Sequence, residues 1–307
     1  MSATRFPLRL NLGPKIRRAE TLTGILFALP AILGFLIFAI GPMIASLIIS
    51  FTDWSLTKSP NWVQLQNYQR LFSDPKVLQS LGNTLKFGLL SVPLGMAASL
   101  GIAVLLNQKL KGQRFFLTLF YFPSILPLAA VLVTFLWVMQ PEFGLLNYVL
   151  SQLGLPPQDW LGNKDMVIPS LVIMSLWGAG GGSVIFLAAL QGIPQDYYEA
   201  AMIDGAGELQ KFRHITLPLL SPVIFFQLVL GMIAALQAFT QAFLLRGGAG
   251  GSALFFNYYL YQNAFQNGRM GFASAMAWML FGLTLILTLL VFRSSALWVF
   301  YENQSRR

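Results

Sequence analysis

Charged residues are scarce in this chain of 307 residues. Only 10% are Asp, Glu, Lys or Arg, whereas 56% are hydrophobic, and a soluble globular domain carries roughly 25% charged residues. So few charges cannot cover a water-facing surface of this size. The apolar residues also fall in runs of about 20 or more, the length that a helix needs to cross a hydrocarbon layer about 30 Å thick. The composition therefore predicts an integral membrane protein.

Cysteine is absent and His214 is the only histidine. These absences exclude a disulfide framework and a thiolate nucleophile, and no His-Glu or Cys-His cluster has metal-ligand spacing. No Gly-x-x-x-x-Gly-Lys-Ser/Thr loop occurs, and the glycine clusters at 178–182 and 247–251 complete no dinucleotide fingerprint. We therefore expect no catalytic site, no metal site and no cofactor bound by this chain.

Six apolar segments are long enough to be membrane spans. The first is too long for the apolar region of a signal peptide, so we expect it to remain as a span. Proline and glycine inside several segments predict kinks, which serve either helix packing or a bend that lines a solute path. The expected fold class is all-α integral membrane, with six transmembrane helices near residues 22–49, 84–106, 115–139, 167–190, 216–243 and 271–292.

Lys and Arg are distributed unequally between alternate loops, which predicts orientation because cationic loops are retained in the cytoplasm. One side carries thirteen, namely Arg5, Arg9, Lys15, Arg17, Arg18, Lys109, Lys111, Arg114, Lys211, Arg213, Arg293, Arg306 and Arg307. The other side carries six, namely Lys58, Arg70, Lys76, Lys164, Arg246 and Arg269. Both termini are therefore predicted to be cytoplasmic. Lys86 lies at the mouth of the second predicted span, where it can snorkel to the interface.

The net charge of +9 reflects cations at the ends of apolar runs and not a continuous basic stripe. No nucleic-acid partner is therefore expected. The predicted spans are also nearly free of acidic residues, which counts against a proton-driven carrier. Sodium sites built from backbone carbonyls and hydroxyls are harder to recognise in a sequence, so an ion-coupled secondary carrier stays open as an alternative.

The longest polar break on the predicted cytoplasmic side spans residues 191–215. Pro194 suits a first helical position, and Gly205 suits a left-handed C-terminal cap. These signals predict a short helix from about 194 to 204, followed by one or two helical turns at about 207–214. One face of the first helix carries residues at spacings of three and four, namely Tyr197, Ala200, Ala201 and Asp204.

Such a helix would be rigidly joined to two membrane spans. It suits a helix-in-groove contact with a soluble partner whose motion could displace those spans. An amphipathic connector lying on the lipid surface is the alternative. The residues by themselves leave both interpretations open.

The same loop resembles the cytoplasmic signature of the permeases of binding-protein-dependent ABC importers. Glu199-Ala200-Ala201 is followed after three residues by Gly205, and nine residues later by Ile215-Thr216-Leu217-Pro218. In that family the loop forms coupling helices that dock in a cleft of the ATPase subunit. The resemblance implies docking residues Glu199, Ala200, Ala201 and Gly205, with Ile215, Leu217 and Pro218 ending the motif. Asp204, on the same helix, belongs to the predicted coupling loop.

The wider chain, from about residue 20 to 293, is similar to the branch that includes permeases for maltose, lactose and glycerol 3-phosphate. The similarity is carried by Asn67-Tyr68 and by Asn83-Thr84-Leu85. A glycine often found shortly before the Asn-Tyr pair is absent, and Gly247-Gly248-Ala249 has alanine where proline often follows the glycine pair. The resemblance implies a type I ABC importer permease fold. Its divisions are cytoplasmic segment 1–21, first span and loop 22–76, transmembrane domain 77–293 and cytoplasmic tail 294–307.

The resemblance also implies an assembly and a function. The chain would pair with a second homologous permease subunit, with two ATPase subunits that bind ATP and Mg, and with an extracytoplasmic solute-binding protein. It would form the path for a mono- or oligosaccharide in the inner membrane of a prokaryote. A non-sugar solute such as glycerol 3-phosphate is an alternative, as is a membrane enzyme or assembly factor without a transport role.

The fifth predicted span carries a polar stripe that suits a solute path. Its members fall within a sector of about 80° when plotted on a helix. Amides in this stripe could bind carbohydrate hydroxyls or, equally, a neighbouring helix. Two aromatic residues, Trp177 and Phe239, could offer apolar faces to a sugar ring, although such residues also serve lipid contact and packing. The stripe is Gln227, Leu230, Ala234, Gln237 and Gln241.

Overall fold

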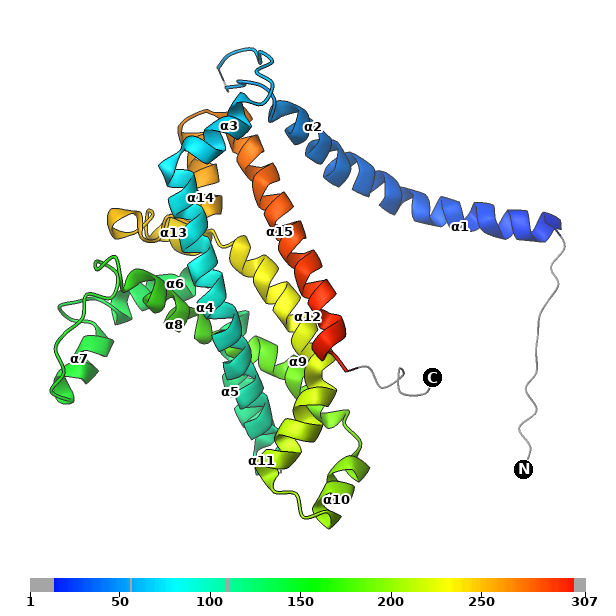
Figure 1. The fold of residues 1–307 in the computed structure, drawn as a ribbon, viewed down its shortest axis with the longest axis vertical. Helices are drawn as coiled ribbons and strands as arrows, with labels where there is room; N and C mark the ends of the chain where they lie inside the picture. Colours follow the sequence, from blue (N-terminus) through cyan, green and yellow to red (C-terminus); the bar gives the residue numbers. More distant parts are fainter. Residues whose placement is uncertain (1–13, 56, 109–110, 301–307) are drawn as a thin grey trace.

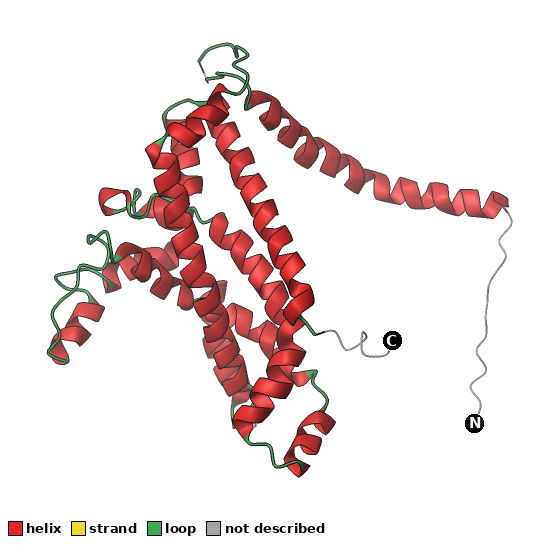
Figure 2. Ribbon diagram, viewed as in Figure 1, coloured by secondary structure: helices red, strands yellow, loops and turns green. Residues whose placement is uncertain are grey.

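The computed structural model describes residues 14–55, 57–108 and 111–300. Over these ranges the chain is helical and contains no β-strand (Figure 1; Figure 2). This confirms the all-helical fold class. Four helices are long and apolar enough to cross a membrane, and six segments qualify if each of two bent helix pairs is one span. The predicted terminal segments 1–21 and 294–307 lie partly outside the described residues, as does Lys109.

The first predicted span forms an arm that leaves the rest of the molecule (Figure 1). It consists of α1 (Pro14–Phe35), a π-helical turn (Leu36–Ile40) and α2 (Gly41–Ile49). The most apolar part of the stretch from residue 23 to 49 is 0% buried within the chain. Only the α2 end is held to the body, where the Trp278 indole donates to Ser46 Oγ at 3.2 Å. An apolar surface of this size requires lipid or another chain to cover it.

The second span begins earlier than expected. α3 (Gln66–Ser73) leads into α4 (Pro75–Leu106), a helix of 32 residues, which is about 48 Å long. Asp74 caps it by accepting a hydrogen bond from the Lys76 backbone N–H at 2.9 Å, and Pro75 occupies the first turn. The helix therefore begins before the predicted span at 84–106, because the cap signal at Asp74 and Pro75 lies in a polar segment. Lys86 lies inside this helix.

The third and fourth spans are each broken into two helices. α5 (Gln113–Ile125) and α6 (Leu128–Val138) meet at an angle of 96°. The break follows from Pro127, because the residue before a proline is pushed towards extended geometry, as Leu126 shows with ψ 141°. α8 (Val167–Leu176) and α9 (Ala179–Gln191) are bent by 47°. The short α7 (Leu145–Gln152) lies in the connection between these two pairs.

The fifth span is continuous with the end of the preceding loop. α10 (Gln195–Ile203) stands apart, but α11 (Glu208–Lys211), a π-helical segment (Phe212–Thr216) and α12 (Leu217–Leu236) follow one another without a break. The second helical turn predicted at about 207–214 is thus the start of the span. At its other end the predicted span 216–243 is interrupted, because the helix stops at Leu236 and resumes as α13 (Thr240–Leu244).

The last elements return beside α4 before the chain makes its final span. They are η3 (Ala249–Gly251), α14 (Phe256–Tyr261), the π-helical η4 (Gln262–Gln266) and α15 (Met270–Trp298). Asn83 donates to the Gly251 carbonyl at 2.8 Å, and the Phe256 backbone N–H donates to Thr84 Oγ1 at 2.9 Å. These bonds fix the start of α14 on α4.

The Asn67-Tyr68 pair is also structural. The Asn67 amide donates to the carbonyls of Ser50 and Thr52 at 2.9 and 2.8 Å, and the Tyr68 hydroxyl lies 2.8 Å from Ser50 Oγ. The pair therefore ties α3 to the end of the arm. Two of the motifs that carried the sequence resemblance thus hold connections between spans.

Small residues allow the central helices to approach closely. A Cβ atom at Gly180 would overlap the backbone carbonyl of Phe120, and one at Gly182 would lie 2.7 Å from Ser99 Oγ. α9 therefore packs directly against α5 and α4. The glycine run 178–182 thus serves helix packing, as one of the two interpretations proposed, and it also lies at the bend between α8 and α9.

Candidate functional site

The loop that carries the signature folds as an elbow, which we define as α10 together with residues 204–216. α10 occupies the position of the predicted helix, although Pro194 is its N-terminal cap, with ψ 136°, and not its first helical residue. Gly205 adopts φ +77°. Two backbone hydrogen bonds close the helix end: the Gly205 N–H donates to the Met202 carbonyl at 3.1 Å, and the Ala206 N–H donates to the Ala201 carbonyl at 2.9 Å. This is the glycine-dependent helix cap that the sequence predicted.

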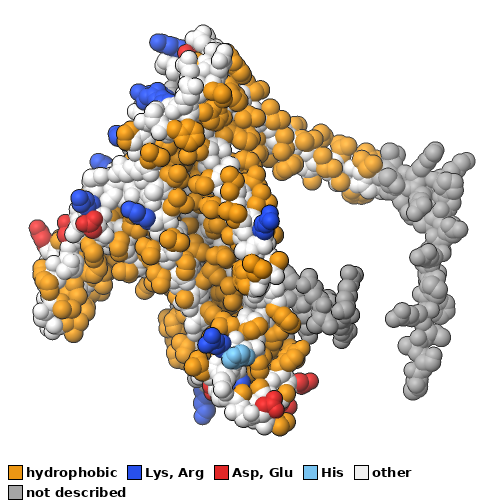
Figure 3. All heavy atoms as spheres, in the orientation of Figure 1, with side chains coloured by type: hydrophobic (Ala, Val, Ile, Leu, Met, Phe, Trp, Pro, Cys, Tyr) orange, Lys and Arg blue, Asp and Glu red, His pale blue; other side chains and the backbone are white. Residues whose placement is uncertain are grey.

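Most of the predicted coupling residues are accessible from outside the chain. Glu199, Ala200, Asp204 and Gly205 are exposed, and Ala201 is half-buried. At the tip of the elbow Ile203 is 87% exposed, an unusual position for such an apolar side chain unless another surface covers it. Figure 3 shows charged side chains gathered near this end of the molecule, below a broad apolar band.

A groove of about 380 Å³ lies between α10 and the start of the fifth span. It brings together four of the predicted coupling residues, and Gln210, Lys211 and His214 from α11 and its π-helical extension complete the wall. Leu217 and Pro218 lie beyond the groove, half-buried in the first turn of α12. The four coupling residues in the groove are Ala201, Asp204, Gly205 and Ile215.

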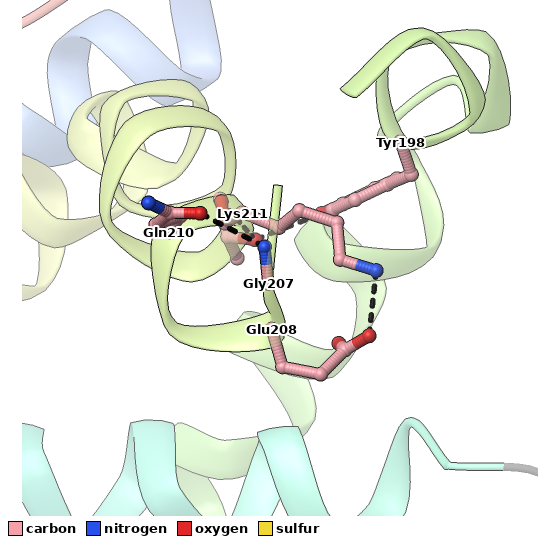
Figure 4. Close-up of polar contacts among 6 residues, drawn as sticks. Tyr198, Gly207, Glu208, Gln210 and Lys211 are labelled. Atoms are coloured by element: carbon pink, nitrogen blue, oxygen red, sulfur yellow. Dashed lines mark hydrogen bonds and ion pairs between the residues drawn. The ribbon is translucent and has the colours of Figure 1, made fainter. Parts of the chain in front are cut away.

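Side chains that the sequence analysis did not select stiffen the elbow. Lys211 is buried, and its Nζ forms an ion pair with Glu208 on the same helix turn (Figure 4). The Gln210 side chain folds back and accepts a hydrogen bond from the Gly207 N–H at 2.9 Å. The sequence Gly-Glu-Leu-Gln before the span could have predicted this helix start, because Gln at the third helical position is typical of an N-terminal capping box.

One hydrogen bond links α10 directly to the fifth span. The Tyr198 hydroxyl lies 3.0 Å from Thr216 Oγ1, where the π-helical segment passes into α12. Thr216 is buried and Tyr198 is half-buried. α10 is therefore joined to the start of α12 by a side-chain contact as well as by the backbone.

A second candidate site is an open cavity of about 670 Å³ lined by residues of α4, α6, α8, α9, α12 and α13. All five residues of the predicted polar stripe line it, although the helix is broken at residues 237–239. Phe239 lines it as well. Trp177 does not, because its side chain is 53% exposed and packs edge-on against Phe135, with ring centroids 5.9 Å apart. Trp177 therefore lies outside the lining of this cavity.

The cavity lining is mainly apolar and carries several uncharged polar side chains. Among the described residues that line it, none is acidic, basic or histidine. The Gln241 Oε1 atom is buried and has no hydrogen-bond partner, and such an atom is costly unless a ligand or water satisfies it. Seryl side chains from α4 and α8 are part of the wall and were not selected from the sequence. The polar lining residues are Ser91, Ser99, Ser175, Gln227, Gln237, Thr240 and Gln241.

Residues 91–299 match the protein family described as "Binding-protein-dependent transport system inner membrane component". The chain belongs to this family. The match includes the elbow and the cavity-lining helices from the second half of α4 onward. The chain is therefore a permease subunit of an ABC transport system, a membrane subunit without catalytic activity, and ATP hydrolysis belongs to partner subunits.

Similar proteins cover nearly the whole length of this permease. The probable ABC transporter permease YesP of Bacillus subtilis is 41% identical over 293 residues, 94% of either chain. The trehalose/maltose permease MalF of Thermococcus litoralis is 35% identical over 91% of this chain and 95% of that protein. A solved bacterial ABC transporter that imports the acidic polysaccharide alginate superimposes with a TM-score of 0.80 and 26% identity, covering 92% of this chain and 97% of that one.

Proposed function

We propose that this permease forms the path for an uncharged carbohydrate in an ATP-driven importer. The supporting observation is the cavity on α12, which combines hydroxyl and amide side chains with the ring of Phe239 and contains no charged lining residue. Hydroxyls of a sugar exchange hydrogen bonds with such groups, whereas a phosphorylated solute such as glycerol 3-phosphate would need a cationic side chain.

The proposed assembly contains a second homologous permease subunit, two ATPase subunits that bind ATP and Mg, and an extracytoplasmic solute-binding protein. The family name includes binding-protein dependence. A related transporter, 25% identical with a TM-score of 0.80, is described in complex with a periplasmic protein that carries an alginate pentasaccharide. The exposed apolar arm of residues 23–49 is a surface that a second permease and lipid would cover.

The proposed topology has six spans in the inner membrane of a prokaryote, with α5–α6 and α8–α9 each counted as one bent span. Both termini and the elbow are cytoplasmic, as the Lys and Arg distribution predicts. This places the elbow where a cytoplasmic ATPase can reach Glu199, Ala200, Ala201 and Gly205. Closure of the ATPase pair on ATP then moves α10 and α12 and switches the cavity from one side of the membrane to the other.

The test is solute-stimulated ATP hydrolysis by the assembled transporter in proteoliposomes. The panel contains trehalose, maltose, diacetylchitobiose and arabinooligosaccharides, each presented on its binding protein, with glycerol 3-phosphate as the charged comparison. We expect at least one neutral sugar to stimulate hydrolysis and to accumulate inside. Stimulation by glycerol 3-phosphate only would contradict the uncharged cargo, and uptake without an ATPase partner would indicate an ion-coupled carrier.

A further inference from the structure

The helix formed by α14 and η4 has an outer face that the described chain covers only in part. Phe256, Tyr259 and Asn263 point into the core and are buried. The opposite face carries residues at spacings of four, and Phe265 at its end is 61% exposed. This outer face consists of residues that are half-buried or exposed, namely Asn257, Tyr261, Gln262, Phe265 and Gln266.

This face continues the wall of the cavity. The Asn257 amide donates to the carbonyl of Gln237 at 3.0 Å, and Gln237 lines the cavity. The Tyr261 ring centroid lies 5.4 Å from that of Phe239, which also lines the cavity. Tyr261 in turn lies 5.2 Å from Phe265. A row of aromatic rings therefore leads from the cavity along the helix to an exposed end.

The direction of this row is set by the fold. α14 and η4 connect α13, at the level of the cavity, with the start of α15 near α3 (Figure 1). In the proposed topology this end is extracytoplasmic, on the side from which a binding protein delivers its solute. The row thus lies between the delivery side and the cavity.

The chemistry of the face favours a carbohydrate over lipid. The part of a span that faces the hydrocarbon core is predominantly apolar, whereas this face carries three amides beside its two aromatic rings and no charge. Aromatic faces carry partial negative charge, which attracts the weakly positive C–H groups on the flat side of a pyranose ring. Amides beside the rings can pair with the hydroxyls at the ring edge.

We propose that the outer face of α14 and η4 is a second carbohydrate subsite. Tyr261 and Phe265 stack against sugar rings of an oligosaccharide while its leading unit occupies the cavity, and Asn257 and Gln262 bind hydroxyls along the way. This subsite rests on the proposed function and extends it, because it assigns to the permease a preference for cargo longer than the cavity alone holds.

The absence of native cysteine allows a direct test of accessibility. Phe265→Cys and Tyr261→Cys variants are treated, in the assembled transporter, with a charged methanethiosulfonate reagent that does not cross membranes. We expect both to be modified, and modification to slow at least threefold at a saturating concentration of a sugar that the wild type transports. Phe72→Cys, at a side chain on α3 that is 71% exposed, is the matched control and should react at a rate independent of sugar.

Side-chain replacement separates ring stacking from simple apolar packing. Phe265→Leu retains apolar volume without a ring, whereas Phe265→Tyr retains the ring. We expect Phe265→Leu to lower transport of the longest sugar that the wild type carries about fivefold, the size expected of one lost aromatic contact. Transport of the shortest carried sugar should change less than twofold, and Phe265→Tyr should transport both at nearly the wild-type rate.

Failure of the subsite is distinguishable from failure of the proposed function. If the wild type transports sugar but the two cysteine variants do not react, the face is covered by lipid or protein and the subsite is refuted. Equal transport by Phe265→Leu and Phe265→Tyr would refute it as well. If the wild type transports no sugar from the panel, the proposed function itself fails and the subsite falls with it.

Discussion

Single residues set the geometry at both candidate sites. Gly205 is required because its φ of +77° ends α10 and turns the chain back towards the fifth span. Gln241 holds an unpaired buried oxygen at the cavity wall. Tyr198 and Thr216 join two helices through their hydroxyls. Each of these roles depends on one side chain or one backbone conformation, so each can be changed separately.

Replacing Gly205 with valine should uncouple ATP hydrolysis from transport. A β-branched residue in this conformation costs about 1–2 kcal/mol, so the helix end should unwind and α10 should lose its fixed direction. We expect transport to fall at least tenfold while membrane insertion and basal ATP hydrolysis persist, as measured by uptake and phosphate release in the same proteoliposomes.

Gly207→Val is the matched control for this variant. Gly207 has φ −72° and ψ 169°, a conformation that valine adopts readily, and its nearest side-chain neighbour would be at 3.9 Å. Wild-type coupling in the control together with loss in Gly205→Val supports the cap. Wild-type uptake by Gly205→Val would refute it.

Replacing Gln241 with leucine should weaken solute transport without disturbing the fold. The change removes the unpaired oxygen, and one hydrogen bond to a sugar hydroxyl is worth about 1 kcal/mol. We expect uptake of the transported sugar to fall about fivefold with unchanged thermal stability of the purified assembly. Gln69→Leu on the exposed side of α3 is the control, and equal uptake by both variants would remove Gln241 from the path.

At the scale of helices, the main feature is that α10 and the fifth span are joined to one another. The fifth span and α11 form one uninterrupted helix from residue 208 to 236, and α10 is attached to it at Tyr198. The π-helical segment at this attachment contains Thr216, whose Oγ1 hydroxyl also donates a hydrogen bond to the Lys211 carbonyl at 3.5 Å. Irregular helical turns of this kind are frequent at functional sites. The elbow and the span should therefore move together.

A double-mutant cycle measures this link between α10 and the span. Tyr198→Phe and Thr216→Val each remove one hydroxyl of the pair and should lower the number of solute molecules transported per ATP. The double variant should lose no more than the stronger single variant, because both remove the same bond, worth about 0.5–1.5 kcal/mol. Tyr148→Phe, at an exposed tyrosine on α7, is the control. Additive losses would indicate that the two hydroxyls act independently.

At the scale of the whole molecule, orientation in the membrane is the feature on which the mechanism depends. Glu199→Cys and Phe72→Cys place single thiols on the elbow and on α3, at opposite ends of the body in Figure 1. In sealed cells an impermeant thiol reagent should modify only Phe72→Cys, and Glu199→Cys should react after the membrane is opened. The reverse pattern would invert the proposed topology and exclude a cytoplasmic ATPase at the elbow.

Local patterns predicted much of this architecture. The lengths of the apolar runs located the four long apolar helices and the two bent helix pairs, because segments that cross lipid must be apolar. Gly205 located the end of α10, because a positive φ favours glycine. The same patterns missed the true start of α4 at Pro75. They also extended the fifth span across the break at residues 237–239, where nothing in the apolar run marks the end of a helix.

The sequence by itself determined that this chain lies in a membrane, that its elbow ends in a glycine cap and that the fifth span has a polar side. Only the tertiary structure decided which groups meet. Gln241 and Ser99 line the same cavity, whereas Trp177 does not line it. Thr84 accepts a hydrogen bond from the start of α14. These contacts depend on how bent spans pack at their glycine residues and not on any local spacing. Residue type sets what a side chain can bind, whereas the path of the backbone sets what comes within reach of it.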